Sequence, residues 1–312
     1  MRVIAQDEFG GPEVLHIAER PVPEPLPTEV RVRVQAAGVN PVDWKTRAGR
    51  GMAGVLGDPP FTVGWDVAGV VDAVGLGVTR FAEGDRVLGM PWFPRQAAAY
   101  AEYVTAPSRQ FAKIADAVET VTAGATPLAA LTAWQVLVDT ADVQPGQRVL
   151  VHAAAGGVGH LAVQIAKARG ATVLGTASAA KHELLTGLGL DEPIDYTSVA
   201  FEDVVRDVDV VVDLIGGEYA HRSLRTLRPG GLLVSVPSGV PEGLPEAARE
   251  AGVRATPFLV EPDGAALTGI ARLLAEGTLR VLVDSTYPLE RAADAHAAGE
   301  QGHNTGKLVL TG

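Results

Sequence analysis

The sequence contains no cysteine among its 312 residues. This absence excludes disulfide bonds and thiolate zinc sites, and it suits a protein of a reducing compartment. The seven histidines are scattered along the chain, at positions 16, 152, 160, 182, 221, 296 and 303. No close group of soft metal ligands is therefore evident, and we expect no metal site.

Basic runs are also absent, and the formal net charge is −11. Nucleic-acid surfaces need clustered Lys and Arg to neutralise phosphates, so we expect no nucleic-acid partner. The start, MRVIAQDEFG, lacks the apolar core of a signal peptide. The uncharged stretch 120–138 is diluted by Gly124, Pro127 and Gln135, which favours a buried linker and helix over a membrane span. We expect a cytoplasmic protein without membrane association.

The chain changes character near residue 147. Before about residue 115, short alternating runs such as EVRVRVQAAGV are separated by Pro, Gly and Asp turns, which predicts a β-rich region. From RVLVHAA onward, buried runs such as ATVLGTAS, DVVVDLIG and GLLVSV alternate with helical segments. This alternation predicts an α/β domain with a parallel sheet covered on both faces.

The C-terminal part has a predicted helix with Leu267, Ile270, Leu273 and Leu274 on one face, and it ends in the strand-like GKLVLTG. The pattern leaves two topologies open. The tail can extend the sheet domain, or it can return to the first domain and leave the α/β part as an insertion.

A glycine-rich turn lies within VLVHAAAGGVGHLAVQIAKARG, residues 149–170. A buried strand leads into the turn and a helix follows, which is the context in which backbone N–H groups bind a dinucleotide pyrophosphate. Against the G-x-G-x-x-G pattern, Ala154 takes the first glycine position, with Gly156 and Gly159 at the second and third. The alternative is a purely structural glycine turn.

The next strand ends in GTASAAK, without the Asp or Glu that usually holds the ribose 2′-hydroxyl of NAD. Ser178 and Lys181 stand there instead. A hydroxyl and an ammonium can hold a 2′-phosphate that a carboxylate would repel, so we expect NADPH as the cofactor. Lys181 can also be an ordinary solvated lysine.

At this point the sequence resembles the medium-chain dehydrogenase/reductase superfamily and, within it, the zinc-independent quinone oxidoreductase family. The resemblance covers essentially the whole chain, beginning with GVNPVDWKTRAG, and is most specific at GVNPVD and at the glycine loop, HAAAGGVG. Further segments follow in the family's order: EGDRV, AEYV, LTAWQVL, IDYTS, DLIGG, GLLVSV and GHNTGKLVL.

The resemblance implies a GroES-like β-rich catalytic domain joined to a Rossmann domain with a doubly wound parallel sheet. Residues 1–117 would form the first part of the catalytic domain, 118–256 the NADP-binding domain, and 257–312 a segment returning to the catalytic domain. It also implies an active site in the cleft between the domains and a homodimer formed by Rossmann edge strands.

Zinc alcohol dehydrogenases of the superfamily carry an early cysteine ligand and a Gly-His-Glu segment. This sequence has Asn40 in place of the first and Gly64-Trp65-Asp66 in place of the second, within PFTVGWDVAGVV. An indole nitrogen keeps its proton and cannot ligate a metal. Without a Lewis acid, the expected substrates accept hydride by conjugation, as quinones and α,β-unsaturated carbonyls do.

Four residues are predicted in catalytic roles. Asn40 matches the family asparagine beside the nicotinamide and can donate to a carbonyl oxygen, although it can also be a turn residue before Pro41. Asp43 matches a carboxylate near the cleft, and a solvated loop acid or a helix N-cap are its alternatives. Lys45 is a possible proton donor or a plain surface lysine, and Trp65 is a cleft-side aromatic or core packing.

The resemblance also assigns residues to the cofactor. These are Asn40, Thr132, Gly156, Gly157, Val158, Ser178, Lys181, Tyr196, Ile215, Val236, Phe258, Leu259, Val260 and Lys307. Asp66 is expected to be structural, and His296, on the apolar face of its helix, a satisfied core histidine. Of Tyr100 and Tyr103 we expect at most one to face the cleft.

The leading hypothesis is therefore an NADPH-dependent reductase of quinones or activated alkenes that works without a metal. Two alternatives stay open. HAAAGGVGHLAVQIAKARGATV also resembles the enoyl reductase domains of polyketide synthases, which implies enoyl-thioester reduction. Because a fold does not determine a function, a non-catalytic NADPH-binding sensor or structural protein is the other.

Overall fold

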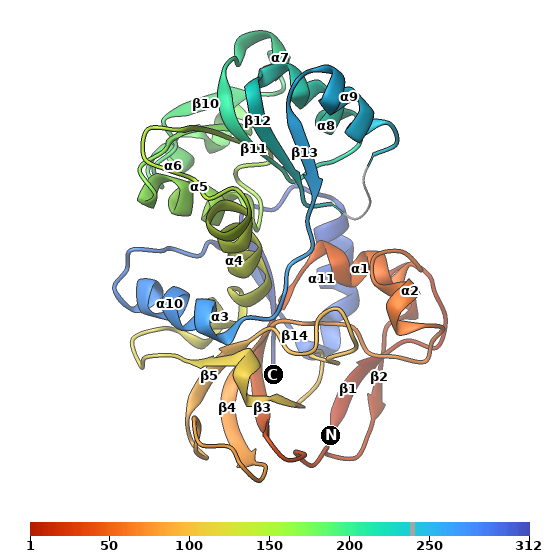
Figure 1. Cartoon of the computed structure of the whole chain (residues 1–312). Helices are drawn as coiled ribbons and strands as arrows, with labels where there is room; N and C mark the ends of the chain where they lie inside the picture. Colours follow the sequence, from red (N-terminus) through yellow and green to blue (C-terminus); the bar gives the residue numbers. More distant parts are fainter. Residues whose placement is uncertain (238–240) are drawn as a thin grey trace. The chain divides into compact units, whose positions relative to one another are not determined.

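A computed structural model describes residues 1–237 and 241–312. Contacts divide the chain into two units, the first made of Met1–Leu131 with Glu261–Gly312 and the second of Thr132–Val260. The domain boundaries expected from sequence, after residues 117 and 256, lie upstream of these two division points. Figure 1 shows the elements of both units, coloured along the chain.

The first unit is built around a seven-stranded sheet of order β14-β15-β3-β4-β5-β7, with β6 paired to β3. Its strands are β3 (Glu29–Val39), β4 (Val67–Val74), β5 (Arg86–Gly89), β6 (Tyr103–Pro107), β7 (Phe111–Lys113), β14 (Val283–Pro288) and β15 (Lys307–Thr311). A separate antiparallel pair joins β1 (Arg2–Ala5) to β2 (His16–Glu19). The long β3 reads apolar at alternate positions in its first half, as a half-buried strand does.

The two ends of the chain meet in this sheet. β15 pairs antiparallel with β3, so that Leu308 lies opposite Val39 and Val309 opposite Gly38. Around the sheet lie α1 (Pro41–Arg47), α2 (Ala53–Leu56), α3 (Thr120–Gly124), α10 (Gly264–Ala275) and α11 (Ala292–Glu300). In α10, Leu267 and Ile270 are buried, on the face that the sequence pattern indicated.

The second unit holds a six-stranded parallel sheet of order β10-β9-β8-β11-β12-β13. Its strands are β8 (Arg148–Val151), β9 (Thr172–Ala177), β10 (Glu192–Asp195), β11 (Val208–Asp213), β12 (Leu227–Ser235) and β13 (Arg254–Pro257). Numbered within the unit, this is the order 3-2-1-4-5-6 of a dinucleotide-binding fold, with its switch point between β8 and β11. The α/β prediction is confirmed.

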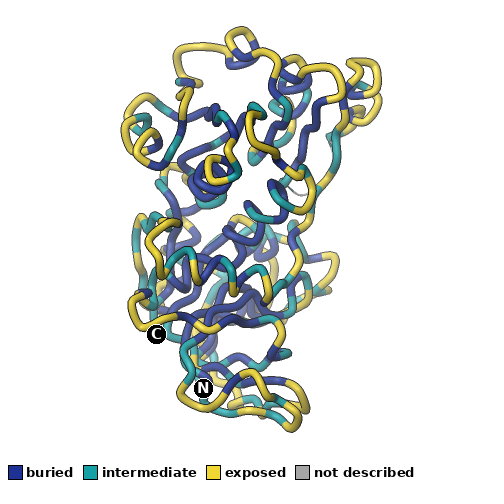
Figure 2. The backbone as a smooth tube through the Cα atoms, turned by 60° about the vertical axis from the view of Figure 1, so that its left-hand side comes forward, coloured by how far each residue is buried: buried dark blue, intermediate teal, exposed yellow. Residues whose placement is uncertain are grey.

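Helices connect these parallel strands, as crossover connections require. They are α5 (Gly159–Ala168), α6 (His182–Thr186), α7 (Phe201–Val204), α8 (Glu218–Ser223) and α9 (Leu244–Glu250). α5 packs on β8 and β9, α8 on β11 and β12, and α9 on β13. The central strands β8, β9 and β11 are largely buried, whereas the edge strands β10 and β13 are mostly exposed or half-buried. Figure 2 shows how burial varies along the backbone.

The uncharged stretch 120–138 forms α3, then α4 (Pro127–Trp134), then the start of a π-helical segment, Gln135–Thr140. α4 contains the division point between the two units. Within the part of the chain that the structure describes, no helix is long and apolar enough to cross a bilayer.

Candidate active site

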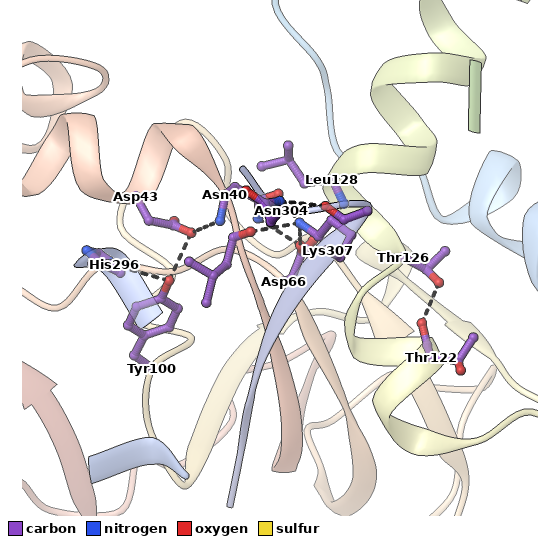
Figure 3. Close-up of polar contacts among 12 residues, drawn as sticks. Asn40, Asp43, Asp66, Tyr100, Thr122, Thr126, Leu128, His296, Asn304 and Lys307 are labelled. Atoms are coloured by element: carbon purple, nitrogen blue, oxygen red, sulfur yellow. Dashed lines mark hydrogen bonds and ion pairs between the residues drawn. The ribbon is translucent and has the colours of Figure 1, made fainter. Parts of the chain in front are cut away.

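A buried polar network lies in the first unit, where β3 ends and α1 begins (Figure 3). It joins Asn40, Asp43, Arg47, Asp66, Tyr100, His296 and Lys307, each 3% exposed or less. Six of these seven side chains are ionisable, so each must find partners inside the protein. Three of the seven, Asn40, Asp43 and Lys307, are site residues that the sequence predicts.

Asn40 is the N-cap of α1, and Pro41 begins the helix. The carboxylate of Asp43, at the third helical position, accepts the Asn40 backbone N–H at 2.6 Å. Its same oxygen, Oδ2, accepts the Tyr100 hydroxyl at 3.0 Å. Asp43 is therefore neither a solvated loop acid nor the N-cap itself, and these two sequence-based alternatives are wrong. The buried Asp43 carboxylate thus caps the N-terminus of α1.

The ionisation of Asp43 is strongly perturbed. Burial raises its pKa to about 7, the charge of Asp66 adds to the rise, and the Asn40 N–H, Lys307 and Tyr100 oppose it. The second oxygen, Oδ1, has no hydrogen-bond partner among the described residues. A carboxyl group with one well-bonded and one unbonded oxygen can change its protonation state near neutral pH.

Behind Tyr100 a chain of hydrogen bonds runs toward the surface. Because the Tyr100 hydroxyl donates to Asp43, His296 Nε2 must donate to Tyr100 Oη, at 3.1 Å. His296 Nδ1 then accepts from Arg47 Nη1 at 3.1 Å, and Arg47 Nη2 donates to Glu300 Oε1 at 2.6 Å. Burial, aided by Arg47, lowers the pKa of His296 to about 3. His296 is thus a satisfied core histidine, as expected.

Asp66 and Lys307 meet beside Asn40. Asp66 Oδ2 accepts the Asn40 side-chain N–H at 2.8 Å and lies 3.4 Å from Lys307 Nζ. Lys307 Nζ also donates to the carbonyl of Val39 at 3.0 Å and to Asn40 Oδ1. The three N–H bonds of the ammonium therefore point at three acceptors of the chain itself. Lys307 contacts Asn40 directly.

Asp66 is held from its other side by α4. Its Oδ1 accepts the backbone N–H of Leu128 at 2.6 Å, in the first turn of that helix, where backbone N–H groups have no partner within the helix. Burial raises the pKa of Asp66, while Lys307, the Asn40 amide and the Leu128 N–H lower it. Since every hydrogen bond to this carboxyl is donated to it, the ionised form fits the site. Asp66 is a structural residue, as expected.

Trp65 and Lys45 lie apart from this network. The indole N–H of Trp65 donates to the carbonyl of Arg95 at 2.6 Å, and its ring stands edge-on to Phe93 at 5.4 Å. Trp65 is fully buried, in core packing. Lys45 is half-buried in α1, and burial together with Arg50 lowers its pKa.

In the second unit, the glycine turn connects β8 to α5. Ala153 adopts a positive φ of 48°, and a side chain on Gly159 would bring its Cβ to 2.2 Å from the Ala153 carbonyl. Only glycine permits this close approach. The N–H of Gly156 donates to Ala153, whereas those of Gly157 and Val158 donate to no group in residues 1–237 or 241–312. Within the described ranges, two backbone donors therefore have no acceptor, directly before a ten-residue helix.

The predicted adenosine-side residues follow the next two strands. Ser178 and Lys181 are half-buried just after β9, and Tyr196, after β10, is half exposed. Ile215 and Val236 follow β11 and β12, and their N–H groups donate to the side chain and the carbonyl of Asp213, respectively. All five lie beyond the carboxyl ends of parallel strands, where ligands of such folds bind.

The remaining predicted cofactor residues are Thr132, buried in α4, and Phe258, Leu259 and Val260, which follow β13. The Phe258 N–H donates to Ser235 at 2.9 Å, and Leu259 is 53% exposed.

The sequence does not reveal the Asp43–Tyr100 bond, the role of Arg47 or the contact of Lys307 with Asp66. It also does not reveal the hydrogen bond from α4 to Asp66. The register of β15 on β3 was the signal required, because it places Lys307 beside the end of β3.

Two family models match the chain. Residues 26–116 match the alcohol dehydrogenase GroES-like domain, and residues 188–310 match the zinc-binding dehydrogenase model. Within the described ranges, no three His, Cys, Asp or Glu side chains stand close enough together to hold a metal ion.

A 2-haloacrylate reductase from a Burkholderia species is 35% identical over 324 residues, which cover 96% of each chain. The quinone oxidoreductase of Pongo abelii is 33% identical, over 99% of this chain and 97% of that one. The chain belongs to the quinone oxidoreductase family of the medium-chain dehydrogenases/reductases. A 309-residue match at 38% identity to pikromycin polyketide synthase component PikAII of Streptomyces venezuelae spans only 8% of that protein.

Solved structures of this family agree over the whole chain. The quinone oxidoreductase of Coxiella burnetii superposes with a TM-score of 0.94 at 36% identity, covering 100% of this chain and 99% of that one. The Escherichia coli quinone oxidoreductase complexed with NADPH gives 0.90 at 30% identity, with both chains fully covered. The CurK enoyl reductase gives 0.89 at 28%, with 99% of each chain covered. The expected combination of a GroES-like unit and a Rossmann-like parallel sheet is confirmed.

Proposed function

We propose that this protein is an NADPH-dependent oxidoreductase that transfers hydride to quinones or α,β-unsaturated carbonyls without a metal. The observation that carries the proposal is the pair of N–H groups of Gly157 and Val158 at the start of α5, which have no acceptor in residues 1–237 and 241–312. They fit a pyrophosphate, and the helix dipole favours its negative charge. The complex of the E. coli relative with NADPH supports the same cofactor.

In this proposal the second unit binds the cofactor. When bound, NADPH supplies a hydride from C4 of its nicotinamide. Gly157 and Val158 donate to the pyrophosphate, while Ser178, Lys181 and Tyr196 hold the adenosine side. Asp195, which stands opposite Ala177 at the end of β10, is already bonded to the Thr197 N–H and hydroxyl, at 3.0 and 2.7 Å.

The first unit supplies the groups that act on the acceptor. Asn40 donates a hydrogen bond from its amide to the acceptor's carbonyl oxygen, where negative charge grows as hydride arrives. Asp43 holds the backbone of Asn40 in place. Lys45 is the proposed proton donor to the reduced acceptor, since its lowered pKa makes proton release easier than from an ordinary lysine.

Metal-free chemistry is supported by the groups at the two positions compared with zinc relatives. Trp65 uses its indole N–H on a backbone carbonyl, and Asn40 contacts the ammonium of Lys307. A fixed cation at Asn40 disfavours a second cation there. Dialysis against a chelator should therefore leave the rate of NADPH oxidation unchanged, and a loss restored by Zn²⁺ would contradict this part.

The proposal is tested by mixing the purified protein with NADPH and a panel of quinones, enones and crotonyl thioesters. Absorbance at the reduced-nicotinamide band measures turnover. We expect oxidation of NADPH with quinones or enones. Failure with every acceptor, together with retained NADPH binding, would instead support the non-catalytic alternative.

Cofactor choice gives a separate prediction. Lys181→Ala should weaken NADPH binding about tenfold or more, because it removes a charge-assisted hydrogen bond, and should leave NADH binding nearly unchanged. Fluorescence titration measures both affinities. Lys167→Ala, which removes a lysine paired with Asp191 in the same unit, is the matched control. Equal weakening of both cofactors by Lys181→Ala would show that the lysine does not read the 2′-phosphate.

A second candidate is enoyl-thioester reduction, which the similarity to the CurK enoyl reductase favours. The chemistry is the same conjugate hydride addition, and only the acceptor differs. In the panel above, a kcat/KM for crotonyl thioesters well above that for every quinone and enone would select this candidate.

A further inference from the structure

The side-chain amide of Asn40 is held between a buried cation and a buried anion (Figure 3). Its Oδ1 accepts from Lys307 Nζ, and its Nδ2 donates to Asp66 Oδ2 at 2.8 Å. The sequence contains only one other asparagine, Asn304, whose Nδ2 donates to the carbonyl of Gly306 at 2.9 Å.

Chemistry dictates which way the amide faces. An ammonium has three donors and no acceptor, and a carboxylate has acceptors only. Reversing the amide would turn its NH₂ group toward Lys307 and its oxygen toward Asp66. Both hydrogen bonds would then be replaced by repulsive contacts in a buried site, where uncompensated polar groups are most costly.

This arrangement leaves the Asn40 side chain with one N–H group that can donate to a ligand. Of the two side-chain N–H bonds of Asn40, one is donated to Asp66, and the other has no acceptor in residues 1–237 and 241–312, so it remains for a ligand. The neighbours are themselves held, since Asp66 also accepts the Leu128 N–H at 2.6 Å and Lys307 also donates to Val39 at 3.0 Å.

We propose that Lys307 and Asp66 are positioning residues, which orient the Asn40 amide and polarise it so that its remaining N–H stabilises the charge developing on the acceptor oxygen. A cation at Oδ1 draws electron density from the nitrogen, which makes the N–H a stronger donor. Lys307 thus acts through Asn40 and does not touch the acceptor. The inference rests on the proposed function for its catalytic part, and on geometry alone for the orientation.

The orientation of the Asn40 side-chain amide is tested by NMR, which requires no catalytic turnover. With ¹⁵N-asparagine labelling, the two asparagines give two side-chain NH₂ pairs, assigned with Asn304→Ser. Lys307→Met should shift the Asn40 pair and speed the exchange of its two protons. Lys113→Met, which removes a lysine paired with Asp85 in the same unit, should leave that pair unchanged. An unchanged Asn40 pair in Lys307→Met would overturn the proposal.

Because Lys307→Met leaves Asp66 buried without its cation, the double variant Lys307→Met/Asp66→Asn is made in parallel. It removes both charges together, so folding is less at risk. We expect the Asn40 amide to lose its fixed orientation in the double variant as well.

Kinetics test whether Lys307 acts through Asn40. Asn40→Ala should lower kcat on the order of a hundredfold, as loss of one donor to a developing oxyanion does. Lys307→Met should lower kcat about tenfold, with KM little changed, in the presence of Asn40 but not in the Asn40→Ala background. Equal factors in both backgrounds would overturn the proposal. If the wild-type protein reduces no acceptor, the proposed function fails, while the NMR result still decides the orientation.

Discussion

Gly38, in β3, shows how closely this site is packed. A Cβ at this position would lie 2.4 Å from Asp66 Oδ2 and 2.7 Å from the backbone carbonyl of Gly124. Neither atom can move freely, since Asp66 is bonded to Asn40 and Leu128. The absence of a side chain at Gly38 is therefore a condition for the contact between Asp66 and Asn40.

Gly38→Ala should destabilise the protein by about 1–3 kcal/mol through overpacking, measured as the free energy of urea unfolding. In the NMR experiment above, it should also displace the Asn40 amide signals. Gly54→Ala is the control, because Gly54 is in a helix and its Cβ would meet no atom within 4 Å. We expect that variant to be about 0.5–1 kcal/mol more stable. Equal stability of Gly38→Ala and wild type would contradict the packing argument.

At the scale of single residues, the sequence predicts which residues belong to the site but does not predict their hydrogen-bond partners. The sequence singles out Asn40, Asp66 and Lys307, with Lys307 as a cofactor residue, but it does not indicate that the three side chains meet. Its partners lie more than 240 residues away in sequence, at separations of 267 and 241. Apolar periodicity indicates which face of a strand is buried but carries no information about which distant polar groups meet there.

At the scale of elements, α1 is a seven-residue helix whose start depends on Asp43. Helices this short are marginal alone, so capping and tertiary contacts decide their stability. Asp43 contributes both, through its bonds to the Asn40 N–H and to Tyr100.

The raised pKa of Asp43, about 7, makes a pH-dependent prediction. An ordinary aspartate titrates near 4, so between about pH 4 and 7 the folded state holds a proton that the unfolded state has lost. The free energy of unfolding should therefore decrease as pH rises through this window, by up to about 1.4 kcal/mol per pH unit from this group. Urea unfolding of Asp43→Asn across the same window should lack this component. Parallel pH profiles of the two proteins would contradict it.

The elements themselves were largely predictable. The alternation of buried runs and helices indicated the parallel sheet, and the strand–glycine–helix pattern located the turn before α5. The antiparallel pairing of β15 with β3 was not predictable from pattern, because a strand's periodicity is the same whichever sheet it joins. The pattern alone therefore leaves the place of the C-terminal tail open, and the family resemblance is what favours its return to the first domain.

At the scale of the whole molecule, each unit contains a buried histidine whose pKa is strongly lowered. His296 lies in the first unit, and His152 in the second, where it contacts Thr176 Oγ1 at 3.2 Å and Ser223 Oγ at 2.8 Å. Burial lowers the pKa of each to about 3, with Arg222 contributing at His152 and Arg47 at His296. Each imidazole therefore stays neutral in the folded protein at pH values where it would be charged in the unfolded chain.

This arrangement predicts acid sensitivity in both units. As pH falls from about 6.5, each of these two histidines binds a proton in the unfolded chain but stays neutral in the folded protein. Each therefore lowers the free energy of unfolding by up to about 1.4 kcal/mol per pH unit, until the pH approaches 3. The sign is opposite to that for Asp43. His152→Gln and His296→Gln should each flatten the pH dependence of urea unfolding over this range, even where they lower stability at pH 7. Their effects should add because the described hydrogen bonds of the two histidines have no partner in common. His16→Gln, at an exposed position, controls for the loss of an imidazole. A wild-type slope retained in both buried variants would show that protonation of these histidines does not drive acid unfolding.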